Sequence, residues 1–251
     1  MGYKLSMIII EDMNKFRDES LLLRNLGFNN AELIDKTSFE ECLYPNDNTI
    51  NIGYANGNII ICDDYYFTNK ILELKQPKYE NLISNLFPDA EILTIACHSG
   101  VNYHAYSLCK NENKIRYKII SFDSEKVEFG ELMKEEVEIY SKAVKTGKKF
   151  IWKESDEEYT EDQLMEDFTF EIIKRRLGAR LDMQESDELQ SLEFNKYKVA
   201  SIEFQSSKKS GKIDNTNLFS RVFFSDKWYF RFFRIFIIIV VYMLIRHYSK
   251  N

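Results

Sequence analysis

Short apolar runs bounded by turn-forming residues recur along the first half of the chain. Residues 4–10 and 91–97 are runs of this kind, and their lengths and flanks predict strands. Residues 49–54 and 59–62 form two more, joined by Asn56-Gly57. Because Asn-Gly readily adopts the positive φ angles of a tight turn, these two segments are predicted to pair as a β-hairpin.

A second group of predicted strands covers residues 101–109 and 114–122, with a turn at 111–113 between them. Within 114–122, the odd positions carry Ile115, Tyr117 and Ile119, and the even positions between them carry Arg116, Lys118 and Ile120. This alternation indicates one solvated face, which is typical of an antiparallel sheet. Residues 196–204 are predicted to add a last strand.

Helical periodicity marks three further parts of the chain. Residues 13–26 and 68–87, the latter divided by a proline, carry apolar side chains at helical spacing. A longer helix is predicted from Thr160 to Gly178, because Thr160-x-x-Gln163 matches a capping box. Strands interleaved with helices and joined by mostly antiparallel connections predict an α+β fold, with a mixed, mainly antiparallel sheet and flanking helices.

The C-terminal part of the chain has a different pattern. Residues 235–245 are eleven consecutive apolar residues, and the apolar stretch 228–245 is interrupted only by Arg231 and Arg234. As a helix this stretch would be roughly 27 Å long, close to a bilayer core of about 30 Å. We therefore predict a C-terminal hydrophobic helix that anchors the protein in a membrane, either spanning the bilayer or lying in its interface; a buried element of the same domain is the alternative. The anchor residues are Trp228, Arg231, Arg234, Ile235, Ile239, Val241, Leu244, Ile245 and Arg246.

Composition and charge divide the chain into three parts. Residues 205–217 contain few apolar side chains and predict a polar linker between a globular domain, 1–204, and a basic and aromatic segment, 218–251. Residues 206–251 hold nine Lys or Arg and two Asp, a net charge of +7, which leaves 25 basic and 38 acidic residues, a net charge of −13, for the rest. Because Lys and Arg are what bind phosphate backbones, we expect no nucleic acid as a partner, and we predict a lipid bilayer and a protein instead.

The four cysteines, Cys42, Cys62, Cys97 and Cys109, are widely spaced and form no CxxC pair. A chain of 251 residues can bury enough apolar surface to fold without disulfides. Cys62 and Cys97 also lie inside apolar runs, where a thiol packs as a small apolar group. We therefore predict buried, reduced cysteines, which indicate the cytoplasm.

Four short motifs resemble an uncharacterised bacterial family, a domain of unknown function whose members begin with a Met-Gly-x-Lys strand. The motifs are Met1-Gly2-Tyr3-Lys4, Leu43-Tyr44-Pro45-Asn46-Asp47, Ile61-Cys62-Asp63-Asp64, and His98-Ser99 after an apolar strand. The resemblance implies no activity, cofactor or catalytic residue, and the hydrophobic tail departs from it. The Asn- and Ile-rich composition is likewise typical of a bacterial protein.

The candidate chemistry lies near the ends of the predicted strands. His98 and His104 belong to neighbouring strands, and with Asp63 or Asp64 they could form a metal or acid/base site. The structural alternative is a hydrogen-bonded histidine pair and aspartates that simply end a strand. Ser99 follows a strand at a turn, as nucleophilic serines do, but lacks the Gly-x-Ser-x-Gly frame. The sequence contains no metal or cofactor motif.

These observations combine a predicted anchor with weak catalytic candidates. The leading hypothesis is a non-enzymatic protein-interaction or accessory domain, tethered to the inner membrane of a bacterium and facing the cytoplasm. The alternative is a hydrolase-like or metal-dependent enzyme that uses His98, His104 and Asp63/Asp64. A third hypothesis, a partner or antidote of a neighbouring gene product, depends on genomic context.

Overall fold

A computed structural model of the chain describes residues 3–12, 15–44, 48–74, 78–122, 124–146, 149–154, 157–183 and 186–199. All of them belong to the first of the two units into which the chain divides, Met1–Ile202. The predicted linker, 205–217, and the segment with the predicted anchor, 218–251, lie outside the described residues. The hydrophobic C-terminal helix therefore stays a prediction.

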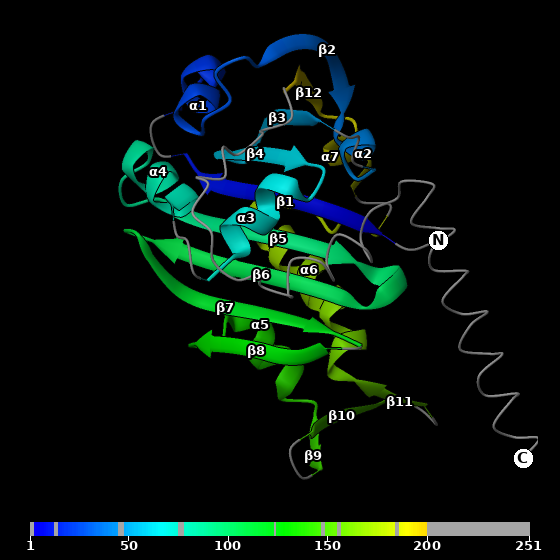
Figure 1. The fold of residues 1–251 in the computed structure, drawn as a ribbon. Helices are drawn as coiled ribbons and strands as arrows, with labels where there is room; N and C mark the ends of the chain where they lie inside the picture. The colour runs from blue at the N-terminus through cyan, green and yellow to red at the C-terminus, as the bar shows by residue number, and fades with distance from the viewer. Residues whose placement is uncertain are drawn as a thin grey trace, which may run out of the picture. The chain divides into compact units, whose positions relative to one another are not determined.

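A nine-stranded sheet forms the centre of the described fold (Figure 1). Its order is β2-β12-β3-β4-β1-β5-β6-β7-β8, and all of its strand pairs are antiparallel. The strands are β1 (Lys4–Glu11), β2 (Glu32–Ser38), β3 (Thr49–Ala55), β4 (Asn58–Asp63), β5 (Glu91–His98), β6 (Tyr103–Lys110), β7 (Asn113–Ser121), β8 (Ser124–Gly130) and β12 (Glu193–Lys198). The α+β class with a large antiparallel sheet is confirmed.

Helices pack against both faces of this sheet (Figure 1). The α3 face carries α1 (Glu19–Asn25), α3 (Tyr66–Leu72) and α4 (Lys78–Leu86). The α6 face carries α2 (Phe39–Cys42), α5 (Lys134–Tyr140), α6 (Glu161–Leu177) and α7 (Asp187–Gln190). Strand β1 shows why its sequence is apolar throughout rather than alternating: Met7 and Ile9 pack into the core on the α6 face, and Ile8 and Ile10 pack into the core on the α3 face.

A small second sheet precedes α6. It consists of β9 (Val144–Thr146), β10 (Lys149–Glu154) and β11 (Glu157–Thr160), in the order β11-β10-β9. Thr160 then caps α6, and its backbone N–H donates to Gln163 Oε1 over 2.8 Å. The capping box and the helix end before Gly178 are confirmed.

The predicted hairpin is also confirmed. Strands β3 and β4 pair from Ile50 opposite Asp63 to Ala55 opposite Asn58. Asn56 and Gly57 both have positive φ, 47° and 73°, as a two-residue hairpin turn requires. The turn after β6 uses the same geometry without a glycine, at Asn111 and Glu112, between β6 and β7.

Several elements differ from the sequence predictions. The first helix begins at Glu19 rather than near residue 13, because the Asp18 side chain caps it by accepting the Leu21 N–H over 2.8 Å. The last strand, β12, begins at residue 193 and is inserted between β2 and β3. Five strands and three α-helices were not predicted as such, namely β2, β8, β9, β10 and β11 with α2, α5 and α7.

The solvated side of β7 is not the side that carries the charges. Arg116 is 2% exposed and Lys118 is 0% exposed, whereas Ile115 is 43% exposed. The charged side chains face the helices on the α6 face, where acidic partners meet them. The antiparallel sheet is confirmed, but the side that carries Arg116 and Lys118 is buried, and Tyr117 on the opposite side is only 3% exposed.

Candidate functional site

The two candidate histidines lie on opposite faces of the sheet. In the β5–β6 pair, Cys97 lies opposite His104, and His98 lies opposite Tyr103. Because adjacent residues of a strand point to opposite faces, His104 shares a face with Cys97 and not with His98. The described structure therefore does not bring the two imidazoles together.

Asp63 caps a helix. It is 3% exposed, and its Oδ1 accepts the Ser6 hydroxyl over 2.7 Å and the Thr68 hydroxyl. Its Oδ2 accepts the backbone N–H groups of Phe67, at 2.6 Å, and Thr68, at 3.2 Å. Burial raises the pKa of Asp63 to about 6, while the hydrogen bonds from Thr68 and Ser6 act in the opposite direction. These four donors occupy both carboxylate oxygens at the start of α3.

The other two candidates hold turns together. Asp64 Oδ2 accepts the backbone N–H of Asn48 over 3.0 Å. Ser99 begins the single-turn 3₁₀ helix η1 (Ser99–Val101) and accepts the backbone N–H of Tyr3 at its Oγ over 2.7 Å. The Ser99 hydroxyl therefore ties the β5–β6 connection to the start of β1, and it is not presented as a nucleophile.

His104 and Cys97 are neighbours on the α6 face, and a histidine beside a cysteine is the pair that cysteine nucleophiles use. Burial lowers the pKa of His104 to about 4 and raises the pKa of Cys97 to about 12. At neutral pH this combination is a neutral imidazole beside a neutral thiol, which is not the reactive thiolate of a cysteine nucleophile. All four cysteines are buried and free, as predicted, and the described residues contain no group of three or more ligands placed to hold a metal ion.

We predict that His104 makes the fold sensitive to acid. It is 1% exposed, and its Nδ1 has no hydrogen-bond partner among the described residues. Its folded-state pKa of about 4 is below the unfolded value of 6.5, so the unfolded chain binds more protons between these values and stability falls as pH falls through them. Relative to wild type, His104→Leu should gain about 2 kcal/mol in the free energy of unfolding between pH 7.5 and pH 5, measured by urea denaturation.

The comparison between the two pH values is its own control, because His104 is neutral in both states at pH 7.5. Groups present in both chains, such as Asp63, cancel in the difference. An equal gap between variant and wild type at both pH values would show that His104 does not titrate on unfolding.

A larger constellation of charged side chains was missed at the sequence level. It lies on the α6 face, between β6–β8 and the helices α5 and α6. We call it the buried charge cluster; its members are Arg116, Lys118, Lys126, Glu128, Glu136 and Glu161, with the hydroxyls of Tyr106 and Tyr140.

Arg116 and Glu136 form the most enclosed pair of the cluster. Glu136 is 1% exposed and accepts Arg116 Nε over 2.9 Å and Nη2 over 2.6 Å, a bidentate arrangement. Burial alone would lower the pKa of Arg116, but the bonds to Glu136 outweigh it and raise the pKa above its ordinary value. Glu136 also accepts the Tyr106 hydroxyl and the Met133 N–H, so every acceptor site of this carboxylate is used.

Lys118 and Glu161 form a second pair. Lys118 Nζ lies 2.5 Å from Glu161 Oε1 and 2.5 Å from the Tyr140 oxygen, which itself donates to Glu161. Burial lowers the pKa of Lys118, and Glu161 opposes this effect. For the acidic partner the signs are reversed: burial would raise the pKa of Glu161, but Lys118 holds this pKa below its ordinary value. The pair is therefore ionic at neutral pH.

Two side chains of β8 join the pairs into one network. Lys126 Nζ lies 2.7 Å from Glu128 and 3.0 Å from Glu161. Glu128 in turn lies 2.9 Å from Arg116. Each cation of the cluster thus contacts two carboxylates or a carboxylate and a phenol, and the three cations and three carboxylates balance in charge.

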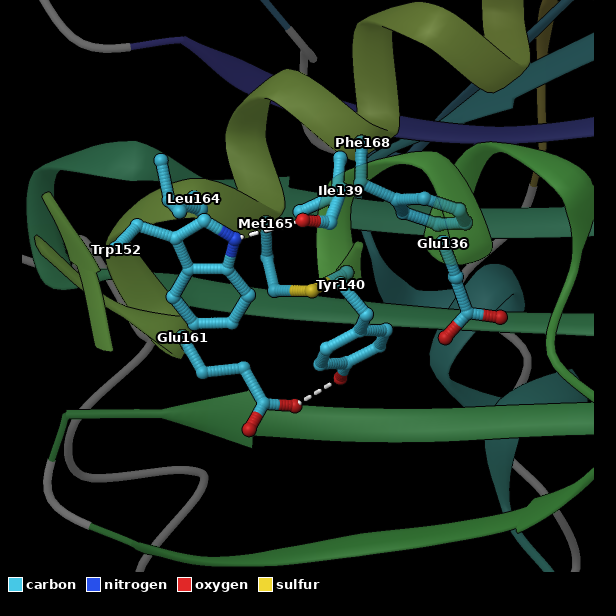
Figure 2. Close-up of a pocket in the computed structure, with 8 residues that line it drawn as sticks. All are labelled: Glu136, Ile139, Tyr140, Trp152, Glu161, Leu164, Met165 and Phe168. Carbon is cyan, nitrogen blue, oxygen red and sulfur yellow. Dashed lines mark hydrogen bonds between the residues drawn. The ribbon is translucent and has the colours of Figure 1, made fainter. Parts of the chain in front are cut away.

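A small hollow adjoins the cluster (Figure 2). It contains about 200 Å³ of empty space, part of it open to solvent, and its lining is Glu136, Ile139, Tyr140, Trp152, Glu161, Leu164, Met165 and Phe168. Figure 2 shows the Trp152 and Tyr140 rings turned toward Met165, with Tyr140 bonded to Glu161 and the Trp152 indole N–H bonded to the Ile139 carbonyl. Because these polar groups already bond to one another, the hollow offers mainly apolar contact.

The chain matches no family model, no curated protein and no solved structure. The resemblance to the uncharacterised bacterial family stays a prediction. Two of its motifs can be placed: Ile61-Cys62-Asp63 ends β4 and Asp64 follows it, and His98-Ser99 is the junction of β5 and η1. Within the part of the chain that the structure describes, no helix is both long enough and apolar enough to cross a bilayer.

Proposed function

We propose that this protein is a non-enzymatic interaction domain, tethered by its C-terminal segment to the cytoplasmic side of a bacterial inner membrane, that works by binding another protein. The observation that carries the proposal is the placement of the chemical groups. Asp63, Asp64 and Ser99 hold turns and a helix start, and His98 and His104 point to opposite faces. The two histidines that the alternative enzyme hypothesis requires are therefore not neighbours in the described residues.

The distribution of exposed apolar side chains supports protein binding. Among the described residues, fifteen large apolar side chains are exposed, and seven of them fall between residues 115 and 144. These seven are Ile115, Phe122, Val127, Phe129, Leu132, Val137 and Val144. Two of the seven, Val127 and Phe129, share one face of β8, and neighbouring exposed apolar side chains of this kind can serve as a contact site.

The sequence supports the tether. The stretch 228–245 is long enough to reach across a bilayer core of about 30 Å as a helix. Arg231 and Arg234 lie near one end among aromatic residues, and Arg246 lies at the other, which is the arrangement of residues that anchor at both interfaces. The basic charge of 206–251 would also favour an anionic lipid surface.

Cell fractionation tests the tether. The full chain is expected in the membrane fraction, and Ile239→Asp combined with Val241→Asp is expected in the soluble fraction, because each charge near the middle of an inserted helix costs about 2.5–3.5 kcal/mol. A chain that ends at Asn217 should be soluble as well. Val137→Asp, on an exposed position of α5, is the matched control and should stay with the membrane. A wild-type chain that is soluble would refute the tether.

A further inference from the structure

Two of the four cysteines meet on the α6 face of the sheet. Cys42, the last residue of α2, is 1% exposed, and Cys62, in β4, is 0% exposed; both belong to the core on this face. Their thiols are close enough to form a hydrogen bond with each other. Cys97 is in β5, which β1 separates from β4, so it lies about 10 Å or more from Cys62. Cys109 packs into the core on the α3 face.

Aromatic packing fixes α2 over this part of the sheet. The Phe39 ring, at the start of α2, stacks on Phe194 of β12 with ring centroids 5.0 Å apart and an angle of 6° between the planes. Phe194 in turn lies directly over Gly53 of β3, where an added Cβ would be 2.5 Å from the ring. Because β3 pairs with β4, this stack holds Cys42 next to Cys62. The contact between the thiols therefore follows from the packing of the core.

We propose that Cys42 and Cys62 form a reversible disulfide when the protein meets hydrogen peroxide, which makes the position of α2 sensitive to oxidation. This property goes beyond the proposed interaction function and does not depend on the tether. The S–S bond of a disulfide is about 2 Å long, and cysteines whose Cα atoms are more than about 7 Å apart cannot form one. Thiols already in contact need only a side-chain rotation and a small shift of α2.

The oxidation proceeds in two balanced steps. The Cys42 sulfur attacks one peroxide oxygen, so that an S–O bond forms, the O–O bond breaks, and a sulfenic acid and one water result. The Cys62 sulfur then attacks the Cys42 sulfur, the S–S bond forms, the S–O bond breaks, and the hydroxyl leaves with the Cys62 proton as a second water. The two thiols lose two electrons and two protons, and one peroxide is reduced to two waters. A dithiol reductant reverses the change.

Cys42 is the sulfur that the oxidant reaches first. It belongs to a single helical turn in which Glu40 and Glu41 are exposed, and the Glu41 N–H donates to the Ser38 hydroxyl over 3.2 Å to cap this turn. Opening a short surface element costs less free energy than unfolding the whole domain. Cys62 lies in a strand that is paired on both sides, and burial raises its pKa well above the ordinary value. It therefore stays an unreactive thiol until Cys42 beside it is oxidised.

The disulfide would close a loop that contains all of β3 and the turn to β4. Closing a loop of this kind restricts the unfolded chain, so the oxidised protein should resist urea better than the reduced protein. The same bond would hold α2 against the sheet even when its hydrogen bonds open. Disulfides in the cytoplasm are mostly transient, which is the behaviour expected of a pair that is reduced at rest.

Mapping the cysteines of the native full chain tests the pairing. The reduced chain is kept in mild detergent, treated with hydrogen peroxide, and its remaining thiols are blocked in urea. Chymotrypsin then separates the two cysteines, because Tyr44 and Tyr54 lie between them, whereas no Lys or Arg does. Mass spectrometry without reductant should find Cys42 joined to Cys62, and dithiothreitol should release both. Cysteines 42 and 62 recovered unlinked, or linked as often to other cysteines, would overturn the proposal.

Two variants provide a matched comparison of stability. Cys97→Ala combined with Cys109→Ala keeps the proposed pair, and peroxide should shift its urea midpoint upward. Cys42→Ala removes the pair, and peroxide should not raise its midpoint. Circular dichroism before oxidation checks that each variant folds, and the mapping of the native chain decides the question for one that does not. An equal rise in the midpoint of Cys42→Ala would refute the role of this disulfide.

Discussion

Replacing Arg116 with methionine is expected to lower the free energy of unfolding by about 3–5 kcal/mol, the largest effect predicted for this fold. The substitution removes both bonds to Glu136, a carboxylate that is 1% exposed and would be left as an uncompensated buried charge. It also removes the donors to Glu128 and to the Phe129 and Gly130 carbonyls. Urea denaturation followed by circular dichroism measures the loss.

Two further variants separate burial from charge. Lys153→Met breaks an ion pair of similar length, 2.7 Å to Glu158, in which both side chains are more than half exposed, so it should cost at most about 1 kcal/mol. Adding Glu136→Leu to Arg116→Met should recover part of the loss, because it removes the orphaned carboxylate. If Arg116→Met and Lys153→Met cost the same, the cluster does not support the fold.

The local signals of the sequence predicted the elements that depend on neighbouring residues. The β3–β4 hairpin follows from Asn56-Gly57, and the start of α6 follows from Thr160 and Gln163, because the groups that fix each are at most a few residues apart. Strand β1 was also predictable from its apolar run. Its central position in the sheet, between β4 and β5, depends on pairing with residues more than forty positions away and was not predictable in this way.

The register of the β5–β6 hairpin places His98 and His104 on opposite faces of the sheet. His98 and His104 are six residues apart, an even spacing that would place them on one face of a single continuous strand. The chain instead turns at residues 99–102, and the turn pairs Cys97 with His104. Which residues face each other across a turn depends on its length and geometry, which the spacing of two histidines does not contain.

The buried charge cluster was hidden for a different reason. Arg116 and Lys118 resemble the solvated positions of a half-buried strand, because a single strand does not reveal which face its neighbours cover. Their main partners, Glu136 and Glu161, come from two helices later in the chain and are recognisable only once α5 and α6 pack on β7. The pairing of Lys118 with Glu128 across β7 and β8 was the one local signal.

Gly130 lies at the end of β8, directly against β7. Among the described glycines, it is the one where an added methyl group should lower the free energy of unfolding most. It has φ of +88°, and a Cβ atom there would lie 2.0 Å from the Ile115 carbonyl oxygen and 3.0 Å from Arg116 Cα. The obstructing atoms are backbone, so they cannot move aside as a side chain would. Gly130→Ala is therefore expected to cost about 2–4 kcal/mol, the sum of the positive-φ penalty and of overpacking.

Gly27→Ala isolates the first of these terms. Gly27 has φ of +91°, and no atom lies within 4 Å of the added Cβ. This variant should therefore lower the free energy of unfolding only through the positive φ, by about 1–2 kcal/mol. Both losses are measured as free energies of unfolding in urea, and equal losses would show that the close approach at Ile115 does not constrain the fold. Because a shift of β7 at Ile115 and Arg116 also displaces Arg116 from Glu136, Gly130→Ala and Arg116→Met should together cost less than the sum of their separate effects.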